Sequence, residues 1–95
     1  MTEIDVSHLS GDEYAVEVKE ASGASRHRVI VSAEALERYG GGARPEALLE
    51  ESFRFLLERE PKEAILSRFE LPVIERYFPE YPREIAALLE RGGES

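Results

Sequence analysis

The stretch from Pro45 to Arg59 carries large apolar side chains around more than half of its circumference when it is drawn as a helix. At about 100° per residue, these side chains cover an arc of roughly 200°, about twice the width of the apolar stripe on an ordinary surface helix. The arc consists of Leu48, Leu49, Ser52, Phe53, Phe55, Leu56 and Leu57. The remaining strip carries Glu50, Arg54 and Glu58, which can form ion pairs one helical turn apart. Such a helix must be covered on two sides, and this requirement constrains the rest of the chain.

Two different partners can cover the second side of this helix. One is the chain itself, with a sheet on one flank and C-terminal helices that carry Phe69, Ile74 and Ile85 on the other. The other is a second copy of the protein, because a small sheet leaves edges and helix surface to protect. For such a homo-oligomer, the interface candidates are Phe53, Phe55, Leu57, Tyr77 and Tyr81. The sequence leaves both arrangements open.

Length and composition predict one globular domain over residues 1–95. Hydrophobic residues make up 42% of the chain and charged residues 34%, which is typical of a globular protein rather than of a disordered or membrane-embedded one. No apolar run approaches the ~20 residues that a transmembrane helix needs. The first residues, 1–5, lack the basic region of a signal peptide. We therefore expect a cytoplasmic protein that has no membrane partner.

The absence of cysteine excludes disulfides, thiolate nucleophiles and metal sites with cysteine ligands. Asparagine, glutamine and tryptophan are absent as well, and there is a single methionine. Heat-sensitive residues are thus rare while charged residues are dense, a composition typical of thermophilic proteins. The net charge of −8 disfavours non-specific binding to nucleic acid, because a phosphate backbone attracts basic surfaces.

Alternating apolar and polar residues predict an N-terminal three-stranded antiparallel meander over residues 3–32. The side chains expected to face the core are Ile4, Val6, Tyr14, Val16, Val18, His27, Val29 and Val31. Turn-forming residues at Ser10–Asp12 and Ala21–Ala24 separate the three segments. The strand order stays open, and the order that we favour places the second strand between the other two.

The residues after this meander, 33–91, predict four or five short helices, so the predicted fold class is α+β. Ser32 can cap a helix over 33–39, which a run of glycines then ends. Proline opens three later segments, and an acid follows in each first turn, which suits the unpaired N–H groups and the helix dipole. These segments begin at Pro45, Pro61 and Pro82. A further short helix is expected within 72–78, because the residue before a proline resists the α conformation.

The sequence contains no recognisable catalytic or cofactor motif, so we expect neither catalytic residues nor a cofactor. The two histidines, His8 and His27, are candidate metal ligands together with Asp5 or a glutamate, and a metal-dependent hydrolase is the corresponding minor hypothesis. The favoured strand order separates the two histidines by a strand. We therefore interpret them as polar sheet residues and expect no metal site.

The segment Tyr77–Pro82 is rich in aromatic residues and prolines for a surface connection. One interpretation is a rigid corner whose rings pack into the core. The other is a docking knob for a partner, because tyrosine suits protein interfaces. Together with the wide apolar arc and the lack of catalytic groupings, this segment favours a non-catalytic, homodimeric protein-interaction module that engages another protein.

Residues 26–60, "RHRVIVSAEALERYGGGARPEALLEESFRFLLERE", resemble a ribbon-helix-helix unit, the strand–helix–turn–helix module of small dimeric bacterial repressors and antitoxins. In that family the strand pairs with its twin across a two-fold axis and presents its outward side chains to the DNA major groove. Transferred by position, the resemblance implies that the groove is contacted by Arg26, Arg28 and Ile30. The alternative function is therefore a DNA-binding regulator or antitoxin component, and nucleic acid is a partner only in this alternative.

A second resemblance concerns the C-terminal half of the chain. The segment "SFRFLLEREPKEAIL" at 52–66, followed by "YFPEY" at 77–81, is similar to a group of small bacterial proteins of uncharacterised function. This similarity implies no activity, no cofactor and no particular partner.

Overall fold

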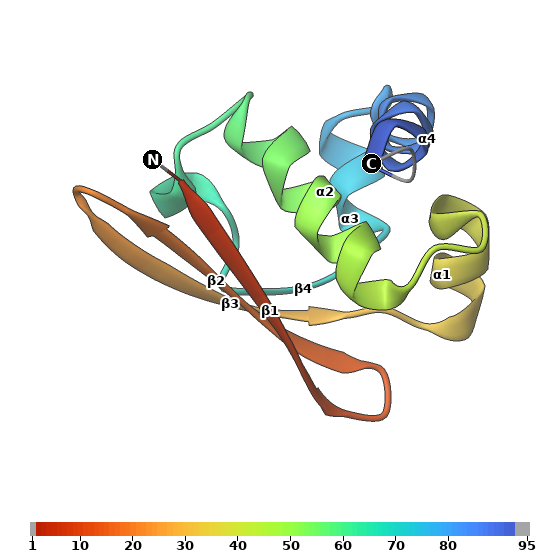
Figure 1. The fold of residues 1–95 in the computed structure, drawn as a ribbon, viewed down its shortest axis with the longest axis horizontal. Helices are drawn as coiled ribbons and strands as arrows, with labels where there is room; N and C mark the ends of the chain where they lie inside the picture. Colours follow the sequence, from red (N-terminus) through yellow and green to blue (C-terminus); the bar gives the residue numbers. More distant parts are fainter. Residues whose placement is uncertain (1, 93–95) are drawn as a thin grey trace.

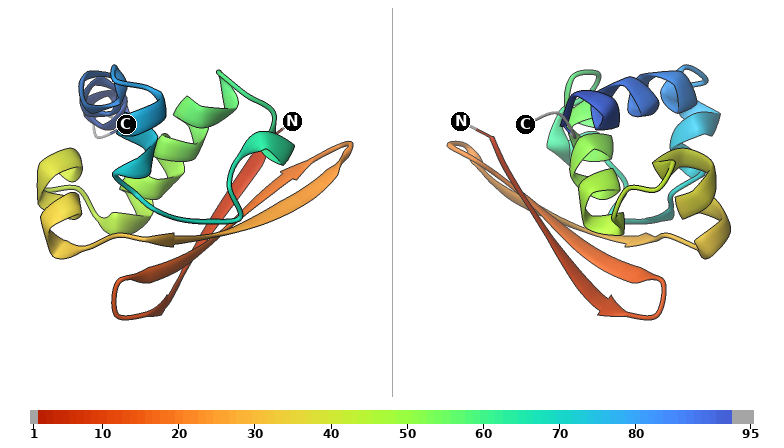
Figure 2. Two further views of the ribbon diagram at one scale, coloured as in Figure 1. Left: turned by 180° about the vertical axis from the view of Figure 1, so that it is seen from behind. Right: turned by 45° about the vertical axis from the view of Figure 1, so that its right-hand side comes forward.

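A computed structural model describes residues 2–92 of the chain. Its fold is α+β, with a four-stranded mixed sheet and helices that cover one face of that sheet (Figures 1 and 2). In chain order the elements are β1 (Glu3–Ser10), β2 (Glu13–Glu20), β3 (Gly23–Ile30), α1 (Ala33–Gly40), α2 (Pro45–Leu57), the 3-10 turn η1 (Lys62–Ala64), β4 (Arg68–Glu70), α3 (Val73–Tyr77) and α4 (Tyr81–Gly92). The predicted α+β class is thus confirmed, while the sheet has one strand more than expected.

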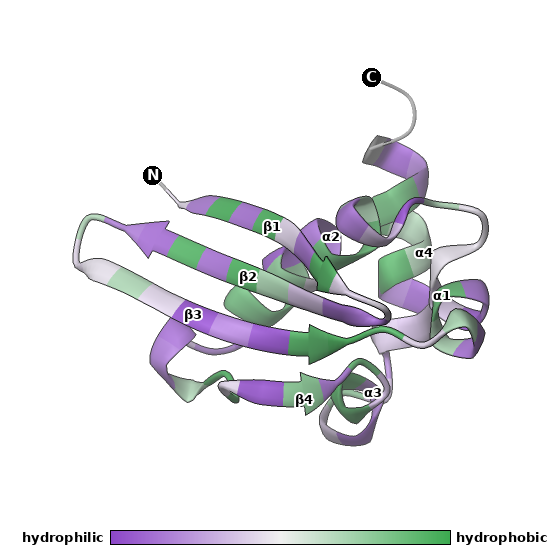
Figure 3. Cartoon of the chain, turned by 90° about the horizontal axis from the view of Figure 1, so that it is seen from below, coloured by the Kyte–Doolittle hydropathy of each residue, from purple (hydrophilic) through white to green (hydrophobic). Residues whose placement is uncertain are grey.

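The predicted meander is present as β1, β2 and β3, which pair antiparallel in sequence order. Tyr14, Val16 and Val18 of β2 face the helices and are buried, because side chains alternate between the two faces of a strand. The opposite face of the sheet is not covered by helices, and the exposed residues of β1 and β3 are mostly hydrophilic. Figure 3 shows hydrophilic and hydrophobic residues following one another along the strands. Gly11 takes a left-handed φ of 53° in the first turn, a conformation that favours glycine.

The fourth strand was not predicted, because residues 33–91 were expected to be helical throughout. β4 pairs in parallel with the end of β3, with Arg68 opposite Arg28 and Glu70 opposite Ile30. Its side chains do alternate, since Phe69 is buried between two exposed neighbours. Three residues are too few for that period to be distinguished from a helical one. The strand depends instead on a non-local partner, which the local sequence does not reveal.

The predicted helix after Pro61 is also wrong, because this segment forms only the single 3-10 turn η1. Lys62 turns inward there and is buried, with its Nζ 3.0 Å from Glu20 Oε1, 2.6 Å from Glu63 Oε2 and 3.2 Å from Ser22 Oγ. Glu20 is the last residue of β2, and Ser22 belongs to the turn between β2 and β3. These contacts attach the segment to the sheet, so the chain leaves the helical direction and continues towards β4.

The start and end of α1 follow the predicted capping residues. Ser32 Oγ accepts a hydrogen bond of 3.0 Å from Ala35 N, which satisfies one of the free N–H groups of the first turn. Gly41 ends the helix with a left-handed φ of 56°. A Cβ on the preceding Gly40 would lie 3.1 Å from the Leu36 side chain of the same helix, so a larger residue there would require Leu36 to shift.

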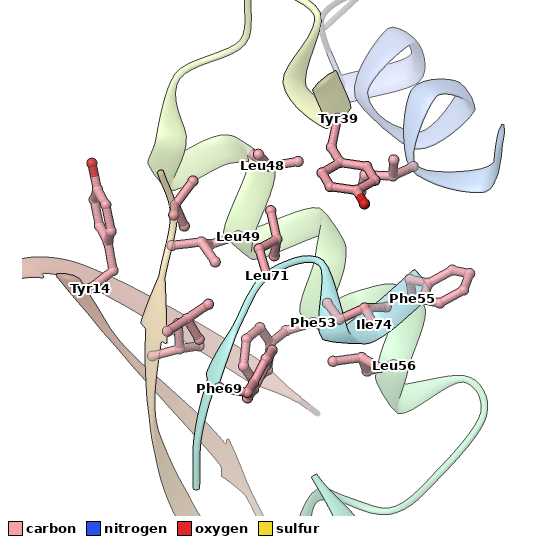
Figure 4. Close-up of a cluster of buried hydrophobic side chains, with 14 of the residues drawn as sticks. Tyr14, Tyr39, Leu48, Leu49, Phe53, Phe55, Leu56, Phe69, Leu71 and Ile74 are labelled. Carbon is pink, nitrogen blue, oxygen red and sulfur yellow. The ribbon is translucent and has the colours of Figure 1, made fainter. Parts of the chain in front are cut away.

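The wide apolar arc of α2 is covered on both sides by the chain itself. The helix packs against β1 on one flank and against α1 and α4 on the other. Leu48, Leu49, Phe53 and Phe55 are fully buried, and Figure 4 shows them between strand and helix partners. Of the two arrangements that the sequence left open, coverage by the same chain is the one present at these positions.

An arginine closes the C-terminal end of α2. The Arg59 guanidinium lies 3.7 Å above the centre of the Phe55 ring, and its Nη1 donates to the Phe55 carbonyl at 3.1 Å. Its Nε donates to Glu80 Oε2 at 3.1 Å, just before α4 begins. Because the last carbonyls of a helix lack partners, a cation here stabilises the helix end and joins it to α4.

The last two helices occur where the prolines of the sequence predicted them. α3 lies within the predicted segment 72–78, and Pro82 is the second residue of α4. Among residues 2–92, no helix is long and apolar enough to cross a membrane.

Candidate interaction groove

A hollow of about 390 Å³ lies where the end of α2, the turn η1, β4 and α3 meet. It is lined by Leu56, Glu60, Ala64, Ile65, Leu66, Phe69, Val73, Ile74, Tyr77 and Phe78. Figure 4 shows three of these side chains, Leu56, Phe69 and Ile74, converging from three different elements. We call this hollow the groove. Its volume falls within the range of ordinary ligand-binding pockets.

Two large apolar side chains of the groove are exposed to solvent. Leu66 is 48% exposed and Tyr77 is 69% exposed, whereas most apolar residues of this chain lie in the core. Within residues 2–92 there is one further exposed large apolar side chain, Leu9 at 46%, and it belongs to β1. Single exposed apolar residues are common, but two at the rim of one apolar hollow make this hollow a candidate for a contact surface.

A buried histidine holds the Leu66 side of the groove in place. His27 on β3 donates from Nδ1 to the Leu66 carbonyl at 2.8 Å, which assigns its Nε2 as the acceptor of the Ser25 hydroxyl, also at 2.8 Å. Backbone bonds from Arg28 N to Ser67 O and from Leu71 N to Ile30 O, at 2.8 and 3.0 Å, continue the attachment. The segment that carries Leu66 is therefore attached to the sheet at several points.

The opposite side of the groove is positioned by α3. Phe78 turns its ring edge towards Phe55, with the ring centres 5.8 Å apart, so Tyr77 points outward. On the other side of α3, Glu75 accepts a hydrogen bond of 2.6 Å from the Tyr39 hydroxyl. Burial, together with this bond to Glu75, raises the pKa of Tyr39 to about 12. Anchored on both sides, α3 presents Tyr77 from a rigid support.

Two charged residues in or beside the groove have no ion-pair partner among residues 2–92. Glu60 is the one charged residue in its lining, and it forms no ion pair within the described part of the chain. Arg76, next to Tyr77, is exposed and likewise forms no ion pair with any residue from 2 to 92. The groove therefore combines an apolar hollow with one free anionic and one free cationic side chain.

The five interface candidates from the sequence have different positions. Phe53, Phe55 and Tyr81 are fully buried in the core of their own chain and cannot contact a second molecule without rearrangement. Leu57 is partly buried, and Tyr77 is exposed at the groove. The aromatic corner thus contains both expected roles, with Phe78 and Tyr81 packed inward and Tyr77 facing solvent.

The residues proposed for DNA contact lie on the open face of the sheet. Arg26 and Arg28 are exposed there, and Ile30 is half-buried. Both arginines are paired with acids of β2, Arg26 with Glu17 at 3.2 Å and Arg28 with Glu13 at 3.3 Å. β3 has a neighbour on each edge, β2 along its whole length and β4 at its end.

The two histidines are separated by β2, as the favoured strand order predicted. His8 Nε2 lies 2.8 Å from the Gly11 carbonyl, and its ring packs against Tyr14, whereas His27 lies in the core. Among residues 2–92, no three His, Asp or Glu side chains are grouped so that they could hold a metal ion. Ser25 and His27 form a hydrogen-bonded pair, but neither borders the groove.

Chemically, the groove offers apolar surface instead of reacting groups, since its lining contains neither a histidine nor a pair of carboxylates. From the sequence, Ile65 and Leu66 were expected on a helix that begins at Pro61 and covers α2, so the exposure of Leu66 beside a groove was not predicted. Compared with known proteins, the chain matches no family, no curated protein and no solved structure.

Proposed function

We propose that this chain is a non-catalytic protein-interaction module whose groove receives apolar side chains of a protein partner. The observation that carries the proposal is the position of Leu66 and Tyr77, both exposed at the rim of an otherwise apolar hollow. Tyrosine is enriched at protein interfaces because its ring buries a large area while its hydroxyl stays wet.

The magnitude of this apolar surface indicates what kind of complex it supports. Burying a whole leucine or aromatic side chain stabilises a complex by about 1.5–3 kcal/mol, and both side chains are already partly covered, so together they contribute roughly 2–3 kcal/mol. Association costs about 4 kcal/mol or more in lost freedom of motion. The two residues therefore serve as anchors within a larger interface of about 800 Å² per partner.

The rigidity of the groove reduces the cost of binding. Its β4 side is hydrogen-bonded to β3, and its α3 side is held by contacts to Phe55 and Tyr39. Because these supports exist without a partner, little conformational entropy has to be lost when the partner arrives.

Selection of binding peptides from a random library tests this proposal, with a matched pair of variants as readout. Leu66→Asp places a charge in the groove, whereas Leu9→Asp makes the same change at a similarly exposed leucine on β1. We expect the selected peptides to carry apolar anchors, to lose at least about tenfold in affinity for Leu66→Asp, and to bind Leu9→Asp unchanged. Peptides that bind both variants equally well would refute the groove as the binding site.

The second candidate function is that of a DNA-binding regulator that uses the open face of the sheet. It is favoured by one observation, namely that Arg68 lies directly opposite Arg28, so that β3 and β4 place Arg26, Arg28 and Arg68 near one another. The acids paired with Arg26 and Arg28 weaken the attraction of this face of the sheet for phosphate. A gel-shift assay with promoter DNA at low salt tests it, because exchange of both paired arginines for alanine should reduce binding and its salt dependence. No shift at low salt ends this candidate.

A further inference from the structure

We infer that the occupant of the groove is Tyr77 of a second copy of this chain, so that two copies form a two-fold symmetric dimer. This inference rests on the proposed function and names its partner. It follows from the shapes and charges that lie side by side on one surface of the molecule.

The surface that carries Tyr77 and the groove is complementary to itself in shape. Tyr77 projects from the same rim whose hollow is lined by Leu56, Leu66 and Ile74. In a two-fold dimer the same patch of each copy faces the other. The projecting Tyr77 of each copy therefore meets the groove of its partner. Each Tyr77 ring then enters the partner's groove while its hydroxyl stays at the wet rim. Both rings and both exposed leucines are covered in one step.

The charges of Arg76 and Glu60, which form no ion pair among residues 2–92, are opposite in sign. Arg76 adjoins Tyr77, and Glu60 lines the groove that the partner's tyrosine enters. Insertion therefore brings each Arg76 towards the partner's Glu60, and the symmetry makes two such pairs. Two chains of net charge −8 repel each other at long range, but salt screens that repulsion beyond about 8 Å at physiological ionic strength. The local contact then determines whether the dimer forms.

The chain is large enough to carry an interface of ordinary size. An interface of about 800 Å² per partner covers roughly one seventh of the 5923 Å² surface of the chain. The groove and its rim draw on four elements, α2, η1, β4 and α3. A contact of this extent is therefore compatible with the size of the molecule.

Sedimentation equilibrium of the intact protein tests the inference. We expect the wild type and the control Leu9→Asp to dimerise with the same dissociation constant, below about 200 µM. Tyr77→Asp and Leu66→Asp are expected to weaken the dimer at least about tenfold, because each buries a charge in an apolar contact. Circular dichroism shows whether each variant is folded, and Tyr77→Ser is the substitute if Tyr77→Asp is not.

A charge exchange identifies the contact itself. Arg76→Glu and Glu60→Arg are each expected to weaken their own dimers, because two like-charged pairs then face each other. An equimolar mixture of the two variants restores both opposite-charge pairs, so native mass spectrometry should show mainly the mixed dimer. A mixture that shows no preference for the mixed dimer overturns the inference.

The remaining outcomes separate the inference from the proposed function. A wild type that stays monomeric up to about 200 µM overturns the dimer, while the proposed function stands if selected peptides still depend on Leu66. A dimer that is insensitive to substitution of Tyr77 and Leu66 lies elsewhere on the surface and also overturns the inference. Peptides that ignore Leu66 overturn the proposed function, whatever the oligomeric state.

Discussion

Replacing Ser52 by alanine should destabilise the protein more than removing the hydroxyl of its partner Tyr81. Ser52 lies within the apolar arc of α2 and is fully buried, as is Tyr81 at the start of α4. The Ser52 hydroxyl donates to the Leu48 carbonyl at 2.7 Å, so the Tyr81 hydroxyl is the donor in its own 2.7 Å bond to Ser52 Oγ. The chain Tyr81 to Ser52 to Leu48 thus has a direction, and the two ends are not equivalent.

This direction determines the magnitudes. In Ser52→Ala the Tyr81 hydroxyl stays buried without an acceptor, which costs about 1–3 kcal/mol. In Tyr81→Phe the Ser52 hydroxyl keeps its bond to Leu48, so the loss is that of one neutral hydrogen bond, about 0.5–1.5 kcal/mol. The double variant leaves neither of these two hydroxyls and should cost less than the two single changes combined.

Thermal and urea unfolding of the wild type, the two single variants and the double variant measure these free energies. For a domain of this size, 1 kcal/mol corresponds to about 4–8 °C in Tm, so the Ser52→Ala effect is well above experimental error. Tyr81→Phe costing more than Ser52→Ala would refute the assigned direction. Additive costs in the double variant would show that the two hydroxyls do not interact.

Three further predictions concern other parts of the core. Phe53→Ala should cost about 3–5 kcal/mol in urea unfolding, and this difference should not depend on protein concentration, because its own chain covers Phe53. Arg59→Ala should cost about 1–2 kcal/mol through loss of its contacts to Phe55 and Glu80, and Arg59→Lys should recover little of it, because only the planar guanidinium stacks on the ring. The pKa of Tyr39 is raised to about 12 in the folded chain, so the unfolded chain loses this proton first as the pH rises above about 10. The free energy of unfolding should therefore fall between pH 10 and 12. In the Tyr39→Phe variant it should fall less steeply when unfolding is measured across this range.

Local signals predicted the elements that depend on local physics. Strands β1 to β3 run for eight residues each, long enough for a two-residue alternation to be read, most clearly in β2 and least clearly in β1. Ser32 marks a helix start because its hydroxyl accepts a hydrogen bond from a free N–H group of the first turn. Pro45 marks one because it has no N–H group of its own and its fixed φ suits the first helical position. Such features need no knowledge of what lies across the fold.

The apolar arc of α2 is a feature whose partner the local sequence does not identify. A helical wheel gives the width of the surface that must be covered, but it does not name the partner. Coverage by α4 depends on Tyr81 and Ile85, which lie about thirty residues further along the chain and are fully buried. The sequence alone therefore left Phe53, Phe55 and Tyr81 as interface candidates, although the fold uses them internally.

The groove escaped prediction for the same reason, and its origin lies in the way α2 ends. Had the chain continued as a helix after Pro61, Ile65 and Leu66 would have had a helical face with which to cover the last turn of α2. Instead Lys62 is bound to the β2–β3 turn, and His27 holds the Leu66 carbonyl 39 positions away in the sequence. The short segment between these two attachments leaves Leu66 half-exposed at the rim of the hollow instead of packed on the end of α2. The contacts that add a fourth strand to the sheet are therefore the same contacts that leave an apolar hollow open at the surface.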